Sequence, residues 1–290
     1  MDIRTREARP DDMPACVDLF LESVDDLRRR HNLPSEGPPQ ADRILASYQH
    51  TLSTGIFHVA EADGRLAALA CAIVRDHVWF LAGFWARPAL QQQHIGMTVL
   101  RGVWKAGELA GAKSFFVWAS SDLPAMAAYM KLGMLPGAQI LTFEGLPETA
   151  ERVSSAYAAQ PLKRAFAMAV DKTVLGTSRE VDHVFFERAG WQGREVLENE
   201  RSIGYYYLDG GSIGPAAWTG SGYAAPVLAL ACREAATSGV KVSLRVPGMN
   251  HQAIRFALDA GLRLASFSHL LMSAPFAHFE QYVPSGPALF

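Results

Sequence analysis

The sequence predicts an α/β (α+β) protein made of two similar domains in tandem. The chain has 290 residues, of which 49% are hydrophobic, so there is enough apolar material for two cores. The order strand, glycine-containing turn, helix, strand, helix, glycine, strand occurs twice. The second helix of each half also ends on a repeated spacing, Ala-xxx-Tyr-xxx-Gly over 125–133 and Ala-xxx-Ala-xxx-Gly over 253–261. These observations indicate an internal duplication.

In the first half, apolar residues that alternate predict strands, and apolar residues at helical spacing predict helices. The turn Asp63-Gly64 predicts a hairpin, and Gly83 inside an apolar run predicts a bulge or a close backbone approach. The expected strands are 3–9, 55–62, 66–74, 78–86, 114–119 and 139–144. The expected helices are one that starts at Pro10, 41–52, 95–110 and 123–132.

The second half repeats this order after a polar, alanine-rich connector over 147–163. The expected strands are 194–199, 203–208, 212–218, 242–246 and 265–272, and the expected helices are 175–189, 224–238 and 250–260. The chain is therefore divided into a first domain over 1–145, a linker over 146–170 and a second domain over 171–290. The exact boundary falls between Gly145 and Thr177.

Charge and cysteine content exclude several classes of function. Lys plus Arg total 27 and Asp plus Glu total 29, which gives no electrostatic reason to bind nucleic acid or a membrane. Residues 28–30 (Arg-Arg-Arg) are expected to form a solvated helix end. The three scattered cysteines predict neither a disulfide framework nor a metal site. No apolar signal region or membrane-length run is present, so a cytoplasmic protein is expected.

The most informative segment runs from Ala86 to Met97. It joins an apolar strand to a helix through a turn that contains Gly96. The first N–H groups of a helix have no partner within the helix, and its dipole makes this end positive. Such a turn is suited to bind a phosphate group.

At this point the first half resembles the GNAT superfamily of acyl-CoA-dependent N-acyltransferases. The superfamily's loop pattern, Gln/Arg-x-x-Gly-x-Gly/Ala after a strand and a proline, falls on residues 88–96, with His94 where the first glycine is usual. The pattern Asn-xx-Ala-xxx-Tyr-xxx-Gly-Phe falls on residues 122–134, with Asp122 in place of asparagine. Histidine is among the residues enriched at positive φ, and aspartate caps a helix as well as asparagine does.

The second half resembles the YitH/HolE-type GNAT domain found at the C-terminal end of some tandem proteins. The residues that carry this resemblance are 209–215, 245–250 and 285–290. Because Ala257 stands where the repeat has Tyr129, the second domain is expected to be a degenerate, catalytically silent GNAT-like domain.

The resemblance implies that each domain is a mixed, mostly antiparallel twisted sheet flanked by helices. It implies an N-acetyltransferase with acetyl-CoA as donor, a small-molecule amine as acceptor and Tyr129 as the general acid. The cofactor-binding residues that it implies lie on the strand end, the loop and the next two helices. They are Phe84, Trp85, Ala86, Gln91, Gln92, Gln93, His94, Ile95, Gly96, Met97, Asp122 and Tyr129.

Several alternatives stay open at the level of sequence. Five residues could deprotonate the amine, and spacing selects none of them: Glu22, Asp25, His58, Asp76 and His77. An acyl-CoA-binding or sensing protein without turnover is the second hypothesis, and an interaction module that has lost CoA is the third. His94 is read as a residue that tolerates a glycine position rather than as a phosphate ligand. A homodimer is also left open.

Overall fold

The computed structural model describes residues 2–32, 40–91, 94–148, 154–236 and 239–290. The chain forms two compact units. The first contains the described residues up to Val117 together with Asp122–Met134 and Leu289, and the second contains the described residues of Trp118–Ser121 and Leu135–Ala288 together with Phe290. Within the described ranges, no helix has the length and apolar character that crossing a bilayer requires.

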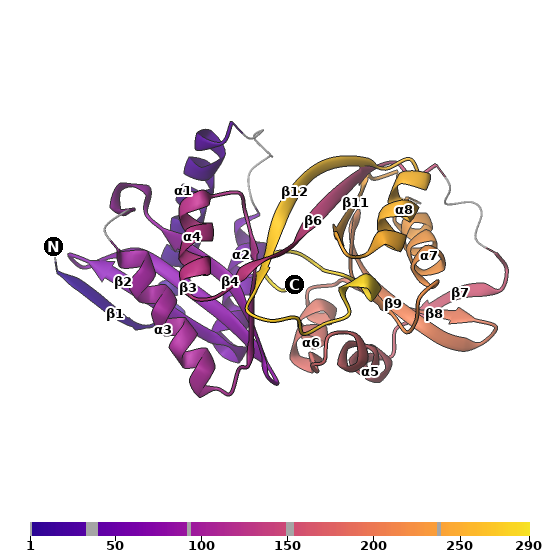
Figure 1. Cartoon of the computed structure of the whole chain (residues 1–290), viewed down its shortest axis with the longest axis horizontal. Coiled ribbons are helices and arrows are strands. Elements are labelled where there is room, and N and C mark those ends of the chain that lie inside the picture. Colours follow the sequence, from indigo (N-terminus) through magenta and orange to yellow (C-terminus); the bar gives the residue numbers. More distant parts are fainter. Residues whose placement is uncertain (1, 33–39, 92–93, 149–153, 237–238) are drawn as a thin grey trace. The chain divides into compact units, whose positions relative to one another are not determined.

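The first unit is built on a sheet in which the strands follow one another in chain order, β1-β2-β3-β4-β5. All neighbouring pairs are antiparallel except β4 and β5, which run parallel. The strands are β1 Ile3–Glu7, β2 Ile56–Ala62, β3 Arg65–Arg75, β4 Val78–Ala86 and β5 Ser114–Ala119. The helices are α1 Met13–Arg30, α2 Ala41–Thr54, α3 Ile95–Leu109 and α4 Leu123–Lys131 (Figure 1).

Two turn predictions for the first unit are confirmed. Asp63 and Gly64 both have positive φ, 49° and 76°, as a two-residue hairpin turn between β2 and β3 requires. The register of β3 and β4 shifts where Cys71 faces Gly83 and Ala72 faces Leu81, so β4 carries one extra residue. The expected bulge at Gly83 is therefore present.

The two faces of the first sheet are covered by different helices. Helices α1 and α2 pack on the face that presents Phe57, Leu69 and Trp85. Side chains alternate along a strand, so His58 and Phe84 face the other side, where α3 lies. Helix α3 comes so close that a Cβ on Gly102 would lie 2.7 Å from His58 Nδ1.

The second unit repeats this strand order in β7-β8-β9-β10-β11, and β6 and β12 extend its sheet beyond β11. Its strand order is β7-β8-β9-β10-β11-β6-β12, and β13 pairs with β10. The strands are β6 Leu135–Gly145, β7 Tyr157–Pro161, β8 Gln192–Glu198, β9 Arg201–Asp209, β10 Ser212–Trp218, β11 Val242–Pro247, β12 Arg263–Met272 and β13 Tyr282–Val283. The helices are α5 Arg164–Val174, α6 Glu180–Arg188, α7 Ala224–Ala236 and α8 His251–Asp259.

The structure differs from the sequence interpretation in the region that joins the two halves. The connector over 147–163 contains β7, and helix α5 at Arg164–Val174 lies mostly in the expected linker. The helix expected over 175–189 begins only at Glu180, as α6, after a turn in which Gly176 has φ of 70°. Strand β6, expected to close the first domain, instead lies between β11 and β12 (Figure 1). Its buried residue Phe143 belongs to the core of the second unit, which is why the strand pairs there.

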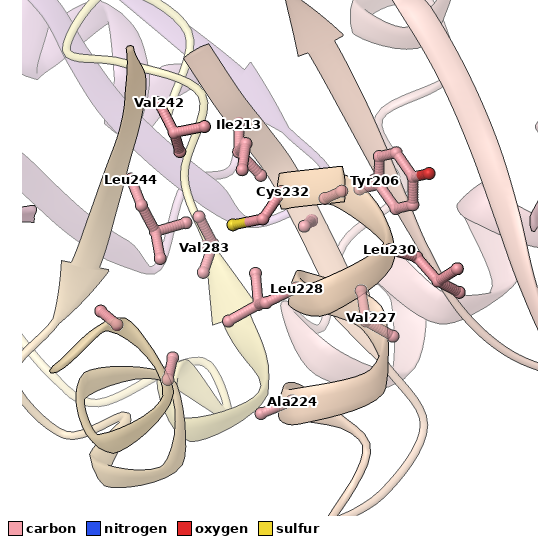
Figure 2. Packing of buried hydrophobic residues seen from close by; sticks show 14 of the residues in the cluster. Tyr206, Ile213, Ala224, Val227, Leu228, Leu230, Cys232, Val242, Leu244 and Val283 are labelled. Atoms are coloured by element: carbon pink, nitrogen blue, oxygen red, sulfur yellow. The ribbon is translucent and has the colours of Figure 1, made fainter. Parts of the chain in front are cut away.

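The main core of the second unit lies between β9–β11 and helices α7 and α8. Leu228 and Cys232 of α7 point toward Leu244 of β11 and Val283 of β13 (Figure 2). Fully buried aliphatic side chains of this size contribute about 1.5–3 kcal/mol each to stability.

The duplicated helix ends are also confirmed. Gly133 and Gly261 follow α4 and α8 with φ of 92° and 76°. In both cases the next N–H returns to the helix, from Met134 to the Tyr129 carbonyl at 3.2 Å and from Leu262 to the Ala257 carbonyl at 3.0 Å. Each helix thus ends in a left-handed glycine cap.

Candidate functional site

Strands β4 and β5 of the first unit separate part of the way along β4. Their parallel ladder covers Val78–Leu81 against Ser114–Val117. The remaining part of β4, from Ala82 to Ala86, stays paired with β3 on its other side. The end of β4 therefore forms a strand edge on the side of β5, because the β4–β5 ladder stops at Leu81.

The backbone register shows which residues face this edge. The Arg87 N–H donates to the Ala67 carbonyl at 2.9 Å, so in this antiparallel pair every second residue points to β3. Trp85 shares that direction. Phe84 and Ala86 have the opposite direction and present their main-chain groups to the open edge.

Two side chains already contact the last of these groups. The Ala86 carbonyl accepts hydrogen bonds from Ser23 Oγ at 3.3 Å and from Gln91 Nε2 at 3.2 Å. Ser23 is a buried residue of α1, and its neighbour Glu22 forms an ion pair with Arg87. The end of β4 is thus fixed by α1.

Trp85 differs from Phe84 and Ala86 in its surroundings. Its ring packs edge-on against Phe20 of α1, with 5.0 Å between the ring centroids. Since its main chain pairs with β3 and its side chain joins the α1–α2 core, Trp85 supports the edge from behind.

Helix α3 begins directly beyond the loop that follows β4. His94 is the residue before the helix and has φ of 62°, a left-handed conformation in which histidine occurs more readily than most residues. The His94 carbonyl accepts from the Thr98 N–H at 3.2 Å, which starts the helical ladder. The N–H groups of Ile95, Gly96 and Met97 precede that ladder, as at any helix N-terminus. Gln92 and Gln93, two expected cofactor-binding residues, lie outside the described residues.

Gly96 brings the start of α3 against the open end of β4. A Cβ on this residue would lie 3.1 Å from Cζ of Phe84 and 3.8 Å from Cβ of Ala86. Contacts near 3.1 Å are tighter than ordinary van der Waals contact, so any other residue would push the helix away from the strand. Glycine here sets the distance between the helix N-terminus and the strand edge.

Tyr129 on α4 reaches the same position from another direction. It is buried, and its ring lies 5.9 Å from the ring of Phe84 in an edge-to-face arrangement. Burial, and to a smaller degree the charge of Asp122, raise the pKa of the phenol, so it is protonated at neutral pH. No described residue forms a hydrogen bond with its hydroxyl group.

Asp122 caps α4 and also binds α1. Its Oδ1 accepts from the Ala125 N–H at 3.2 Å, and its Oδ2 lies 2.9 Å from a guanidinium nitrogen of Arg30. Arg30 also pairs with Asp26. The expectation that Arg30 belongs to a solvated helix end is therefore incomplete, since it holds the start of α4.

The five candidate bases are spread over the first unit. Asp76 and His77 are in the turn before β4, at the opposite end of that strand from Ala86. His58 lies under Gly102 of α3, where burial lowers its pKa. Asp25 is exposed on α1, and Glu22 is paired with Arg87. The geometry assigns none of them to the Phe84 edge.

Sequence reasoning missed the residues that fix the edge from α1. Ser23 and Arg30 lie on the same helix at positions that look like an ordinary polar face. Only the fold brings them to β4 and α4. The signal in the sequence is Arg87, a charged residue directly after an apolar strand, and its partner in the structure is Glu22 of α1.

Comparison with known proteins identifies the first unit. Residues 21–134 match the model of the acetyltransferase (GNAT) family. That match includes the end of β4, the start of α3 and the α4 helix with Tyr129. Among curated proteins, none matches the chain.

Solved structures match the chain over nearly its whole length. A putative acetyltransferase from Pyrococcus horikoshii is 17% identical, with a TM-score of 0.79 over 99% of this chain and 96% of that one. A GCN5-related N-acetyltransferase from Sphaerobacter thermophilus is 16% identical, with a TM-score of 0.65 over 93% and 95%. A tandem GNAT protein from the clavulanic acid biosynthesis pathway is 13% identical, with a TM-score of 0.61 over 94% and 99%.

At these identities the structural similarity concerns the fold, and it extends the GNAT architecture to both units. The YitH/HolE-type identity of the second half stays a prediction. The acetyltransferase (GNAT) family match therefore lies within the first unit, over residues 21–134, and the solved structures share their fold with both units.

Proposed function

We propose that the first unit binds acetyl-CoA and transfers its acetyl group to a small amine, with Tyr129 as the general acid. One observation carries the proposal: Phe84 is the meeting point of an open strand edge, a helix N-terminus and a buried phenol. Gly96 of α3 and Tyr129 of α4 both contact its ring. Its peptide groups face the edge that β5 leaves.

Each of these parts suits a different portion of an acyl-CoA molecule. The N–H groups of Ile95, Gly96 and Met97, which precede the helical ladder, would hold the pyrophosphate. The peptide groups of Phe84 would pair with the amide-containing arm as a neighbouring strand does. A main-chain N–H at this edge would also stabilise the oxyanion that forms on the thioester carbonyl.

The proposed reaction is a direct displacement. The amine nitrogen attacks the thioester carbonyl, a C–N bond forms, and the C–S bond breaks with its electron pair on sulfur. The thiolate accepts a proton from the Tyr129 hydroxyl. The amine releases one proton to solvent water, and the Tyr129 phenolate takes a proton back from solvent, so that the turnover is balanced. The raised pKa of Tyr129 keeps the phenol protonated over the neutral pH range, so the donor is in the required form.

The test is the Tyr129→Phe variant, assayed by release of CoA thiol with acetyl-CoA and an amine panel. The change removes one oxygen and keeps the ring that contacts Phe84, so the fold should be retained. General acid catalysis typically contributes about 10²–10⁴-fold, and we expect kcat to fall by about 10²-fold with KM for acetyl-CoA nearly unchanged.

Tyr48→Phe is the matched control. Tyr48 is also buried and its hydroxyl has no hydrogen-bond partner among the described residues, but it lies in the α1–α2 core. This variant should keep wild-type kinetics. Equal kcat values for Tyr129→Phe and the wild type would refute the role of Tyr129.

A second candidate function is acyl-CoA binding without turnover. It is favoured by the position of the candidate bases, none of which the geometry places at the Phe84 edge. This alternative predicts that acetyl-CoA binds and that no amine in the panel releases thiol. Amine-dependent thiol release that is lost in Tyr129→Phe would exclude it.

A further inference from the structure

The second unit contains a short strand that has no counterpart among the described residues of the first. Strand β13 pairs antiparallel with β10, with Ala216 opposite Val283 and Ala217 opposite Tyr282. The parallel ladder between β10 and β11 covers only Ser212–Ile213 against Ser243–Leu244. Strand β13 lies beyond that ladder and contacts both β10 and β11. It therefore fills the place where β10 and β11 separate.

The filled edge of β10 is the equivalent of the open edge of β4. The Thr219 N–H donates to the Ile203 carbonyl at 2.8 Å, so Ala217 also points to β9. Ala216 has the opposite direction and lies opposite Val283 of β13. Counted back from that anchor, Ala216 corresponds to Phe84, which lies three residues before Arg87 in β4. The strand edge that the proposed function assigns to a ligand at Phe84 is therefore paired with β13 of the same chain at Ala216.

Polar side chains hold this segment from the surrounding elements. Asn250 is fully buried; its Oδ1 caps α8 by accepting from the Ala253 N–H at 3.1 Å, and its Nδ2 donates to the Tyr282 carbonyl at 3.1 Å. Asn250 occupies the position that Asp122 has in the first half. Arg245 donates to the Ser285 carbonyl at 3.3 Å.

The last residue of the chain is anchored by a buried polar cluster. Arg179 donates to the Phe290 main-chain oxygen at 2.6 Å, and the Tyr282 hydroxyl donates to the same atom at 2.8 Å. Asp171, itself fully buried, accepts from Arg179 at 2.9 Å and from the Tyr205 hydroxyl. A buried charge of this kind is stable only with partners, so the cluster ties the segment to α5 and β9.

Gly214 of β10 lets the segment after β13 come close to the strand. A Cβ on Gly214 would lie 2.3 Å from the Pro284 carbonyl oxygen, a distance that no side chain can accept. Gly214 also has φ of 135°, which favours glycine. Only glycine permits the segment after β13 to lie directly on the strand.

The helix start that would hold a phosphate group is also engaged. The Gly222 N–H, in the turn before α7, donates to the Gln252 side-chain oxygen at 2.9 Å. Ala257 stands at the position of Tyr129 and is buried in the core. In the second unit the strand edge is therefore paired with β13, the turn before the helix is bonded to Gln252, and an alanine replaces the proposed proton donor.

We propose that the segment Phe279–Ala288, anchored through Phe290, is a built-in occupant of the second unit and takes the strand edge that acyl-CoA uses in the first. The chain then binds a single acyl-CoA, because β13 occupies the edge of β10 whether or not acyl-CoA is present. The proposal rests on the proposed function for the identity of the excluded ligand, but the seating of the segment is independent of it.

The experiment is hydrogen–deuterium exchange of the full chain, without and with saturating acetyl-CoA. The Val283 amide should exchange about as slowly as amides of the central strands β9 and β11, and acetyl-CoA should leave its rate unchanged. Fast exchange in the free protein would overturn the proposal, as would faster exchange of Val283 when acetyl-CoA is added.

The same data separate this proposal from the proposed function. Acetyl-CoA should slow exchange in the peptide that spans Phe84–Met97. If that peptide does not respond, the proposed function fails while the Val283 amide still decides whether the segment is seated.

A variant tests the anchor. Asn250→Asp keeps an oxygen to cap α8 but loses the donor to the Tyr282 carbonyl, and loss of one buried hydrogen bond should speed Val283 exchange by about 10-fold or more. Asp122→Asn, the reverse exchange at the matching position of the first half, should leave Val283 unchanged. Unchanged Val283 exchange in Asn250→Asp would contradict the anchoring role of Asn250.

Discussion

Helix α3 can hold its position over β4 only because Gly107 has no side chain. A Cβ on Gly107 would lie 2.4 Å from Cδ1 and 2.6 Å from Nε1 of Trp79. Trp79 is completely buried and packs against Trp104 and Phe115, with ring centroids 5.7 and 5.4 Å away. The indole therefore has no free space into which it could move.

Two opposite contributions determine the effect of Gly107→Ala. Alanine in a helix is favoured over glycine by about 1 kcal/mol. Overpacking a core position costs about 1–3 kcal/mol, and an approach of 2.4 Å to a buried ring places this site at the upper end. We expect a net loss of about 1–2 kcal/mol in the free energy of unfolding.

Native-state hydrogen exchange of α3 amides is the assay, because it reports on the first unit alone. Gly107→Ala should speed their exchange by about 5- to 30-fold, which is the loss above expressed as a rate. Gly102→Ala is the control, since its neighbour His58 is half-buried and can turn. Slower exchange in Gly107→Ala, as helix propensity alone predicts, would refute the close packing of α3.

Three further predictions concern single positions of the first unit. Hydrogen bonds from Arg6 hold the pKa of Asp12 below its usual 3.8, so this pair stabilises the fold above that pH and the stabilisation is lost as the pH falls. Asp12→Asn should cost about 1–2 kcal/mol in urea unfolding at pH 7, and the difference from the wild type should shrink at pH 3. Asp122→Asn keeps the helix cap and loses the partly exposed ion pair with Arg30, so it should cost less than about 1 kcal/mol, whereas Asp122→Ala should cost about 1 kcal/mol more in the same assay. Because His94 has positive φ, thermal unfolding should show His94→Gly as neutral or stabilised by up to about 1 kcal/mol and His94→Val as destabilised.

Local chemistry made the strands and turns of the first unit predictable from the sequence. The bounds of β4 and β5 follow from apolar runs that end at a turn or at a charged residue. Gly83 and His94 revealed a bulge and a positive φ because few residue types tolerate those conformations.

Partners distant in sequence were not predictable in this way. Strand β13 has two residues, too few for any alternation to register, and it exists only because β10 offers an edge. Strand β6 was recognised as a strand, but its pairing with β11 and β12 depends on which core buries Phe143. The link from Arg30 to Asp122 joins residues 92 positions apart.

The central claim is that the first unit holds acyl-CoA at the start of α3, and isothermal titration calorimetry with acetyl-CoA tests it most directly. Met97 lies in the first turn of α3 and is half-buried. In Met97→Glu the new carboxylate is favourable to a helix N-terminus but repels a phosphate group. Two like unit charges about 5 Å apart, at an effective dielectric constant near 20, repel each other by about 3 kcal/mol, which corresponds to about 100-fold in affinity. We predict one acetyl-CoA per wild-type chain, binding about 100-fold weaker to Met97→Glu, and near-normal binding to the neutral control Met97→Gln. Equal affinity of all three proteins, or two molecules bound per chain, would contradict the account.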